Sequence, residues 1–569
     1  MDLSLLLPCG KILCRSLILF LLVTCFAASS SSALEREPTF RVQAPEADAL
    51  FAFSQAQMLV EEGDLDGAAA ALHEALRHDP EAPYLHYQFA ELSFLLDQPE
   101  AGLDAAQQAL RHDPEYLPAL RLLGNYYFTQ QQFGEALPYF ETLQKLAPDD
   151  ENSILHLAVS HASVGEMSRA LDLLKNHLRD FPQAVPTALA LGRLYQEMEL
   201  SSLAEEVYKD LQAFPAGDLP ATLELGRLYQ GEKEMAKARA LYRESLARFP
   251  GNPTLLHSYA RLLILLNRDD EAFSLYDRLL ELYPDDLEAW RKRGLLFFEH
   301  KEWRQAADDF SRILEMNPTF FLIRYYLAGA EDRLGEKEAA IADFLAIPEE
   351  AEVYEDARSR AAYLLFELER GEEGEALLLE LTGSIKARPD TFILLASLQA
   401  ARKATVEALA TLRRAREHYP EEAELAYQQA LLCERMGKKE ESWQAVSDAI
   451  EIDPDHAESL NLLAYSLAEE GVRLDEALLL AQRALFLKEA GHIFDTVGWV
   501  FYRMGRYAEA SEQLLEASRR LPDDPEVAEH LADTWKALGE KAKAAALYRR
   551  LLELEPERPG VPAKLRSVE

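Results

Sequence analysis

Cysteine is nearly absent from this chain of 569 residues, which contains only four. Cys9, Cys14 and Cys25 lie close to the N-terminus, and only Cys433 lies farther along the chain. A disulfide framework needs several cysteines in the folded region. We therefore expect no intramolecular disulfide once an N-terminal leader that ends at Ala33 has been removed.

The motifs of common enzyme classes are also missing. The chain has no P-loop, no His-Glu-x-x-His, no Gly-x-Ser-x-Gly and no Cys-x-x-Cys. His73 and His78, like His156 and His161, are five residues apart, whereas two ligands on one helical face need a spacing of four. Among 98 acidic residues, neighbouring carboxylates arise by chance. The sequence thus predicts a protein that is not an enzyme, with no cofactor and no metal site.

Basic charge is scarce as well. The chain has 59 Lys and Arg residues against 98 Asp and Glu, a net charge of −39. An acidic surface repels DNA, RNA and anionic lipid. We therefore expect protein partners and no nucleic acid, with no direct membrane contact unless Cys25 carries a lipid.

What the sequence does contain is a repeat. The heptapeptide ALRHDPE occurs at residues 75–81 and again at 109–115, 34 positions later. A proline follows the same period with few departures, and its first and last members, Pro80 and Pro556, lie fourteen periods apart. The marker loses its phase between residues 319 and 390, where Pro348 and Pro389 are displaced. The chain therefore holds about fifteen repeats.

Each repeat is predicted to form two short helices. In residues 491–524 the first helix has apolar residues at helical spacing, Gly505 breaks the chain, and a second apolar face follows before Pro522 ends that helix. Gly498 and Ala510 are small, because two antiparallel helices joined by a tight turn need small residues at their closest approach. Sustained alternation of apolar and polar residues is missing, so we expect an all-α protein with almost no strand.

This repeat resembles the tetratricopeptide repeat (TPR). The family pattern is a small residue, an aromatic residue, a turn glycine, then alanine, aromatic, alanine and proline. In three repeats it is carried by Gly124, Tyr127, Ala136, Phe140 and Pro148; by Gly226, Tyr229, Ala238, Tyr242 and Pro250; and by Gly498, Phe501, Gly505, Ala510, Ala517 and Pro522, where Leu514 replaces the second aromatic residue.

The resemblance implies an α-solenoid, a right-handed superhelix of about fifteen helix pairs whose first helices line a concave groove. We divide the repeats into an N-terminal array (49–318), irregular repeats (319–390) and a C-terminal array (391–558), followed by a tail (559–569).

The N-terminus has the order of a secretory signal peptide. Lys11 and Arg15 precede an apolar run at residues 16–28, and small residues follow up to Ala33. We predict a signal peptide at 1–33, a short linker at 34–48, and export to the periplasm or cell envelope.

Two alternatives to cleavage after Ala33 remain open. The apolar run could be a retained anchor, although a transmembrane span needs about 20 residues. Residues 22–25, LVTC, resemble a bacterial lipobox, which would make the protein an outer-membrane lipoprotein with a lipid on Cys25.

Basic side chains recur at an inward place of the predicted groove. Arg193, Arg227 and Arg261 occupy the ninth place of three successive repeats, where they could form a binding ladder for an acidic partner segment. The alternative is local pairing, with Glu197 beside Arg193 and Glu224 beside Arg227.

Arg121 and Asn125 stand two repeats before this ladder. Their stretch, RLLGNYY, partly resembles the carboxylate clamp of TPR co-chaperones, which grips a peptide C-terminus. The later clamp positions are occupied here by Val159, Pro186 and Ala190, so the resemblance is incomplete.

Aromatic side chains form a second candidate surface. Tyr427, Tyr465, Trp499 and Tyr502 fall at inward places of the repeats from residue 423 onward. Aromatic residues on a groove often anchor a partner, but they can equally pack between neighbouring repeats.

These observations favour a non-catalytic scaffold or adaptor of the bacterial cell envelope that binds partner segments in its groove. A chaperone-like holdase and an accessory subunit of an envelope glycan synthesis or export complex are the alternatives.

Overall fold

The computed structural model describes residues 47–383 and 387–569. The predicted signal peptide 1–33, Cys25 and the linker up to residue 46 lie outside the described residues. Within the described ranges the chain is helical and contains no strand. The all-α prediction is confirmed.

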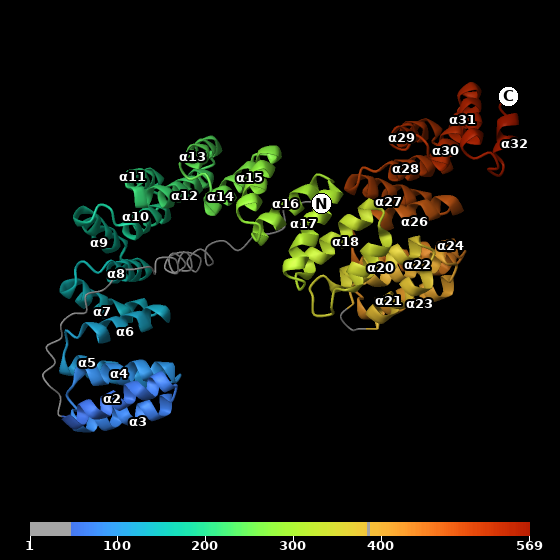
Figure 1. Ribbon diagram of the computed structural model, residues 1–569. Coiled ribbons are helices and arrows are strands. Elements are labelled where there is room, and N and C mark those ends of the chain that lie inside the picture. The colour runs from blue at the N-terminus through green and yellow to red at the C-terminus, as the bar shows by residue number, and fades with distance from the viewer. Residues whose placement is uncertain (1–46, 384–386) are drawn as a thin grey trace. The chain divides into compact units, whose positions relative to one another are not determined.

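In residues 47–383 and 387–569, thirty helices form fifteen pairs, and a short helix α32 (Val561–Arg566) follows them (Figure 1). The first helices of the repeats are α2 (Ala47–Glu62), α4 (Pro83–Leu95), α6 (Leu117–Thr129), α8 (Glu151–Ser163), α10 (Val185–Glu197), α12 (Pro215–Gly231), α14 (Pro253–Leu265), α16 (Leu287–Glu299), α18 (Phe321–Leu334), α20 (Tyr354–Glu367), α22 (Pro389–Ala401), α24 (Ala423–Arg435), α26 (Ala457–Glu470), α28 (Gly491–Arg503) and α30 (Pro525–Ala537).

The second helices are α3 (Leu65–His78), α5 (Pro99–His112), α7 (Phe133–Leu146), α9 (Met167–Asp180), α11 (Ser201–Gln212), α13 (Met235–Arg248), α15 (Asp269–Leu282), α17 (Trp303–Met316), α19 (Lys337–Leu345), α21 (Gly371–Thr382), α23 (Thr405–His418), α25 (Lys439–Ile452), α27 (Leu474–Leu487), α29 (Tyr507–Arg520) and α31 (Lys541–Leu554). The predicted α-solenoid of fifteen helix pairs is confirmed.

The chain divides into two compact units, of which the first ends at Pro284 and the second begins at Asp285. The N-terminal unit holds α2–α15 and the C-terminal unit holds α16–α32. The predicted divisions at 318 and 390 concern the regularity of the repeat rather than its compactness, and they stay predictions.

The turn between the two helices of each repeat has a left-handed residue, and these residues recur every 34 positions without a slip. They are Gly63, Asp97, Gln131, Gly165, Glu199, Lys233, Asn267, Lys301, Gly335, Glu369, Lys403, Gly437, Gly471, Gly505 and Gly539. Only seven of the fifteen are glycine, so the turn geometry is imposed by the helix pair even where the residue disfavours it.

The irregular stretch 319–390 therefore keeps the phase of its turns and departs from regularity in its second helices. Helix α19 has only 9 residues, and residues 346–353 connect it to α20. Pro348 lies in this connection, whereas Pro389 is the first residue of α22, a place that proline favours. The two displaced prolines thus have different structural roles.

Small residues hold the two helices of a pair close together, as predicted. A Cβ atom on Gly124 would lie 2.9 Å from the Phe140 ring, and one on Gly498 would lie 2.6 Å from the Leu514 side chain. Ala510 is fully buried. Backbone approach at this place leaves no room for a larger side chain.

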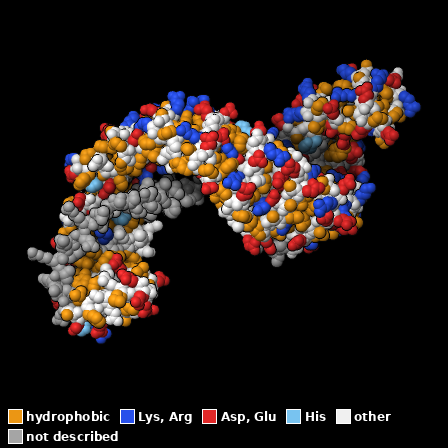
Figure 2. Space-filling view, viewed as in Figure 1, with side chains coloured by type: hydrophobic (Ala, Val, Ile, Leu, Met, Phe, Trp, Pro, Cys, Tyr) orange, Lys and Arg blue, Asp and Glu red, His pale blue; other side chains and the backbone are white. Residues whose placement is uncertain are grey.

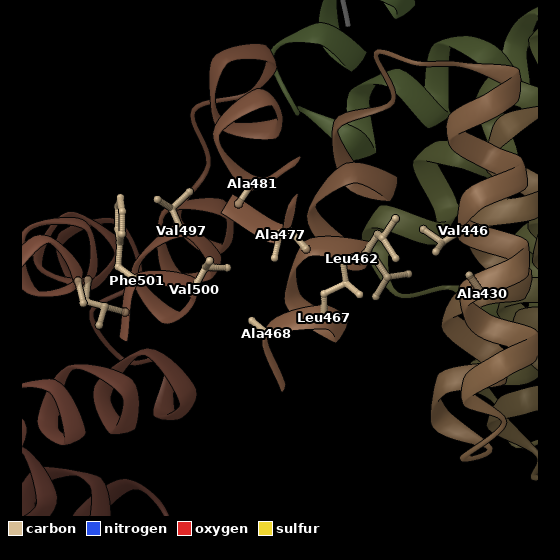
Figure 3. Close-up of a cluster of buried hydrophobic side chains, with 14 of the residues drawn as sticks. Ala430, Val446, Leu462, Leu467, Ala468, Ala477, Ala481, Val497, Val500 and Phe501 are labelled. Carbon is tan, nitrogen blue, oxygen red and sulfur yellow. The ribbon is translucent and has the colours of Figure 1, made fainter. Parts of the chain in front are cut away.

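Apolar side chains link neighbouring repeats within a unit. In the C-terminal unit, Val446, Leu462, Leu467, Val497 and Phe501 belong to one buried cluster that extends from α24 to α30 (Figure 3). The face drawn in Figure 2 mixes apolar side chains with charged side chains of both signs. Neighbouring repeats of a unit thus bury their apolar faces against each other, which is how a solenoid is stabilised.

Candidate functional site

The predicted arginine ladder is partly joined by one carboxylate. Arg193 on α10 donates from Nη2 to Oε1 of Glu224 at 2.6 Å, and Arg227 on α12 donates from Nη1 to the same oxygen at 3.1 Å. Glu224 is buried, and the Arg193 side chain is only 15% exposed. The structure thus brings Arg193 and Arg227 together, with Glu224 between them.

The predicted pairing of Glu224 with Arg227 is present, whereas the bond from Arg193 crosses to the next repeat. A charge-assisted bond between repeats positions their first helices relative to each other. Arg227 and Arg261 are both exposed, but Arg261 on α14 makes no ion pair within the described parts of the chain. Of the three arginines, Arg261 is therefore the one whose charge no carboxylate pairs with there, and Arg193 supports the fold.

Arg121 and Asn125 both lie on α6 but differ in their surroundings. Arg121 donates to Oδ2 of Asp150 in the next repeat at 2.9 Å. Burial raises the pKa of Asp150, but hydrogen bonds from Ser153 and Arg121 outweigh it and hold the pKa below its usual range. Oδ1 of Asn125 is buried and has no partner among the described residues. The two side chains therefore do not converge on one anion site.

Asn125 lines a hollow of about 810 Å³ in the N-terminal unit, which we call the N-terminal hollow. Three successive first helices, α2, α4 and α6, form its walls, and Leu72 of α3 contributes to it. Its other lining residues are Phe53, Ala56, Gln57, Val60, Glu61, Gln88, Glu91, Leu92, Phe94, Leu95, Leu122, Tyr126 and Thr129. Leu95 lies at the edge of the hollow and is 68% exposed. A hollow of this size that combines apolar and polar side chains is a candidate ligand site.

The four predicted aromatic residues are all half-buried. The Trp499 ring stacks on the Tyr502 ring at 4.7 Å and on the His530 ring of α30 at 4.0 Å. Its Nε1 donates to Oε1 of Glu469 at 2.5 Å. Trp499 therefore packs between neighbouring repeats, which is the second of the two predicted roles.

Tyr465 and Tyr427 also contact other repeats. The Tyr465 hydroxyl on α26 donates to Glu526, two repeats later, and the Tyr427 ring lies 5.4 Å from the His456 ring. Helix α30, which carries His530, thus lies beside Tyr465, Trp499 and Tyr502. Tyr427 is separate from them.

His530 is a residue that sequence reasoning missed. It is buried, and its Nδ1 lies 3.0 Å from Oδ2 of Asp495. Burial lowers the pKa of His530, but the hydrogen bond and the charge of Asp495 outweigh it, so the pKa is raised. Its partner lies 35 positions earlier, in the preceding repeat, so no local spacing could have revealed the pair.

The C-terminal tail neutralises acidic residues of the last repeat. Lys564 of α32 donates to Glu529 at 2.7 Å and to Asp533 at 2.5 Å, and Arg558 donates to Glu529 at 2.5 Å. Helix α32 therefore caps the end of the C-terminal unit.

Residues 47–383 and 387–569 hold no group of three or more His, Cys, Asp or Glu side chains placed to bind a metal ion. None of their helices combines the length and the apolar character that a membrane span requires.

Models of the tetratricopeptide repeat match most of the array. One matches residues 229–296, and another matches residues 53–116, 87–151, 121–185, 291–355 and 498–562. The chain is also similar to a TPR repeat-containing protein of Pseudomonas aeruginosa, with 36% identity over 116 residues. That match spans 20% of this chain and only 20% of the Pseudomonas protein.

Three solved structures are similar to the chain. A chain of the APC/C hetero-tetramer Cut9-Hcn1 is 13% identical, with 80% of this chain and 96% of that chain covered and a TM-score of 0.36. A chain of Naa15/Naa10 bound to HypK-THB is 13% identical, with 91% of this chain and 96% of that chain covered and a TM-score of 0.30. MamA of Desulfovibrio magneticus RS-1 is 18% identical, with 30% of this chain and 96% of that chain covered and a TM-score of 0.27.

Proposed function

The chain belongs to the tetratricopeptide repeat family of protein–protein interaction scaffolds, and from this premise we propose that it is a non-catalytic scaffold of the bacterial cell envelope. In this proposal the leader directs export, and the first helices of the repeats bind segments of partner proteins. The partner binds by occupying surfaces that the packing of the repeats leaves open.

The N-terminal hollow is the observation that carries the proposal. Three first helices combine around it, and their apolar side chains stay accessible: Leu95 is 68% exposed and Val60 is 42% exposed. Burying an apolar side chain of a partner against them gains roughly 25 cal/mol per Å² of apolar surface. An apolar side chain of a partner segment can cover them.

Site-specific crosslinking in the native host tests this proposal. A photo-reactive phenylalanine analogue is placed at Leu95, on the edge of the hollow, and in a control at Asp104, which is exposed on the second helix α5. We expect a defined partner to be crosslinked from Leu95 and not from Asp104. The same proteins captured from both positions, or no capture from Leu95, would contradict a partner site in the hollow. Capture of many unrelated proteins from Leu95 would favour the holdase alternative.

Export is tested separately by mass spectrometry of the N-terminus of the native protein. Cleavage after Ala33 predicts a mature chain that begins at Leu34 and carries no lipid. A diacylated Cys25 would instead establish the lipoprotein alternative and place the scaffold on a membrane.

A further inference from the structure

The N-terminal hollow has charge of only one sign. Two of its lining residues, Glu61 and Glu91, are acidic, and no Lys, Arg or His is among the residues that line it. Neither carboxylate makes an ion pair in the described parts of the chain. The hollow therefore keeps a negative potential that a ligand can compensate.

Neutral groups hold Glu91 in place. The Tyr87 hydroxyl donates to Oε1 of Glu91 at 2.5 Å, and Nε2 of Gln88 donates to Oε2 at 3.0 Å. Burial is the main reason why the pKa of Tyr87 is raised, and the hydrogen bond and charge of Glu91 add to it. Neutral donors orient a carboxylate without removing its charge, so Glu91 stays available to a cation.

The nearest predicted cation does not neutralise this charge. Arg121 lies one turn before Asn125 on α6, but its guanidinium donates to Asp150 in the next repeat at 2.9 Å. The partial resemblance to a carboxylate clamp therefore does not describe this hollow. A peptide carboxylate placed here would meet Glu61 and Glu91, which have the same charge as the carboxylate.

The remaining lining groups specify what accompanies the cation. Leu92 and Leu122 contribute apolar surface, and the Phe94 and Tyr126 rings lie together at 5.1 Å between centroids. A complementary ligand thus combines a large apolar group and a positive charge.

We propose that the N-terminal hollow binds an extended segment of a partner protein in which a large apolar residue is next to a lysine or arginine. The apolar side chain enters between α2, α4 and α6, and the cation meets Glu91 and Glu61. This inference rests on the proposed function, because it names the kind of segment that the scaffold site selects. Charge complementarity then sets specificity.

Three dye-labelled peptides with blocked termini test the selection. They differ only at their centre, which is Leu-Lys-Leu-Lys, Leu-Glu-Leu-Glu or Ser-Lys-Ser-Lys, and fluorescence anisotropy measures their binding to the full mature chain. We expect the first peptide to bind at least tenfold more tightly than either of the others, about 1.4 kcal/mol. Its affinity should fall as salt is added, since salt screens the carboxylates. No preference for the first peptide over the second overturns the inference.

One substitution assigns the selection to the hollow. Glu91→Gln keeps the size of the side chain and should remove most of the preference for lysine over glutamate. Glu100→Gln, which removes an exposed charge on α5 outside the hollow, is the matched control. Circular dichroism verifies that each variant is folded. An unchanged lysine preference in Glu91→Gln overturns the inference.

The crosslinking at Leu95 separates this inference from the proposed function. Sequencing the partner segment that is captured there should reveal a large apolar residue beside lysine or arginine. A defined partner with an acidic or uncharged segment leaves the scaffold function intact and overturns the charge selection. No partner at all contradicts the scaffold site itself.

Discussion

Gly226 supports one of the closest helix contacts in the N-terminal unit, and we predict that Gly226→Ala destabilises the fold. The Tyr242 ring of α13 lies directly over this glycine of α12, and a Cβ there would lie 2.2 Å from Cζ and from the hydroxyl oxygen. Tyr242 is fully buried, and Gln230 donates to its hydroxyl at 3.2 Å. The ring cannot move aside without losing this bond.

The size of the effect follows from three contributions. Overpacking of a filled core costs about 1–3 kcal/mol, and loss of the Gln230 bond costs about 1 kcal/mol. An alanine in place of glycine within a helix returns about 1 kcal/mol. We therefore expect the free energy of unfolding of this region to fall by about 2 kcal/mol.

Hydrogen exchange measured by mass spectrometry is the appropriate assay. Repeats of a solenoid can open locally, so a global melting temperature averages over many of them. Amides of α12 and α13 should exchange about 30-fold faster in Gly226→Ala, the factor that corresponds to 2 kcal/mol. Gly134→Ala is the control, because a Cβ on Gly134 meets nothing within 4 Å. It should leave protection unchanged or raise it.

The last repeat of the array has alanine at the position of Gly226. There Ala532 corresponds to Gly226 and Tyr548 corresponds to Tyr242, and the Tyr548 hydroxyl donates to Asp533 at 2.5 Å. A tyrosine can thus accompany alanine when its hydroxyl has another partner. Unchanged or slower exchange of α12 in Gly226→Ala would mean that Tyr242 relocates in the same way and that the close contact is not a constraint.

Gly505→Ala should destabilise its repeat by about 1–2 kcal/mol through the left-handed backbone alone, because φ is +77° and a Cβ would meet nothing; unchanged exchange of the flanking helices would contradict this. Arg193→Ala should cost about 1–3 kcal/mol, since it leaves buried Glu224 short of a partner, whereas Arg261→Ala should stay within about 0.5 kcal/mol; equal melting temperatures would contradict the assignment. Burial, and then the charge of Asp343, raises the pKa of Glu331 to about 7. The free energy of unfolding therefore falls as pH rises toward that value, because the buried carboxyl group resists ionisation. Glu331→Gln should therefore raise the melting temperature at about pH 8 and not at about pH 5; an equal gain at both would refute this.

Much of the repeat could be predicted from the sequence because it depends on local spacing. The 34-residue period, the paired helices and the small residue at Gly498 follow from steric rules that act within one repeat. The turns were predictable where glycine marks them, as at Gly505. They were not predictable at Lys233 or Glu199, where the packed helix pair imposes a left-handed conformation on another residue.

The site residues were named from the sequence, but the tertiary structure decided what they do. The period places Asn125, Arg193 and Trp499 at the same position of three different first helices. Their partners lie on neighbouring repeats: Glu224 for Arg193 and His530 for Trp499. The angle at which repeats stack and the rotamers of long side chains set these contacts, and neither is periodic in the sequence. For the same reason only the packing of α2, α4 and α6 revealed a hollow whose charged lining is acidic, although a basic ladder had been predicted farther along the same unit.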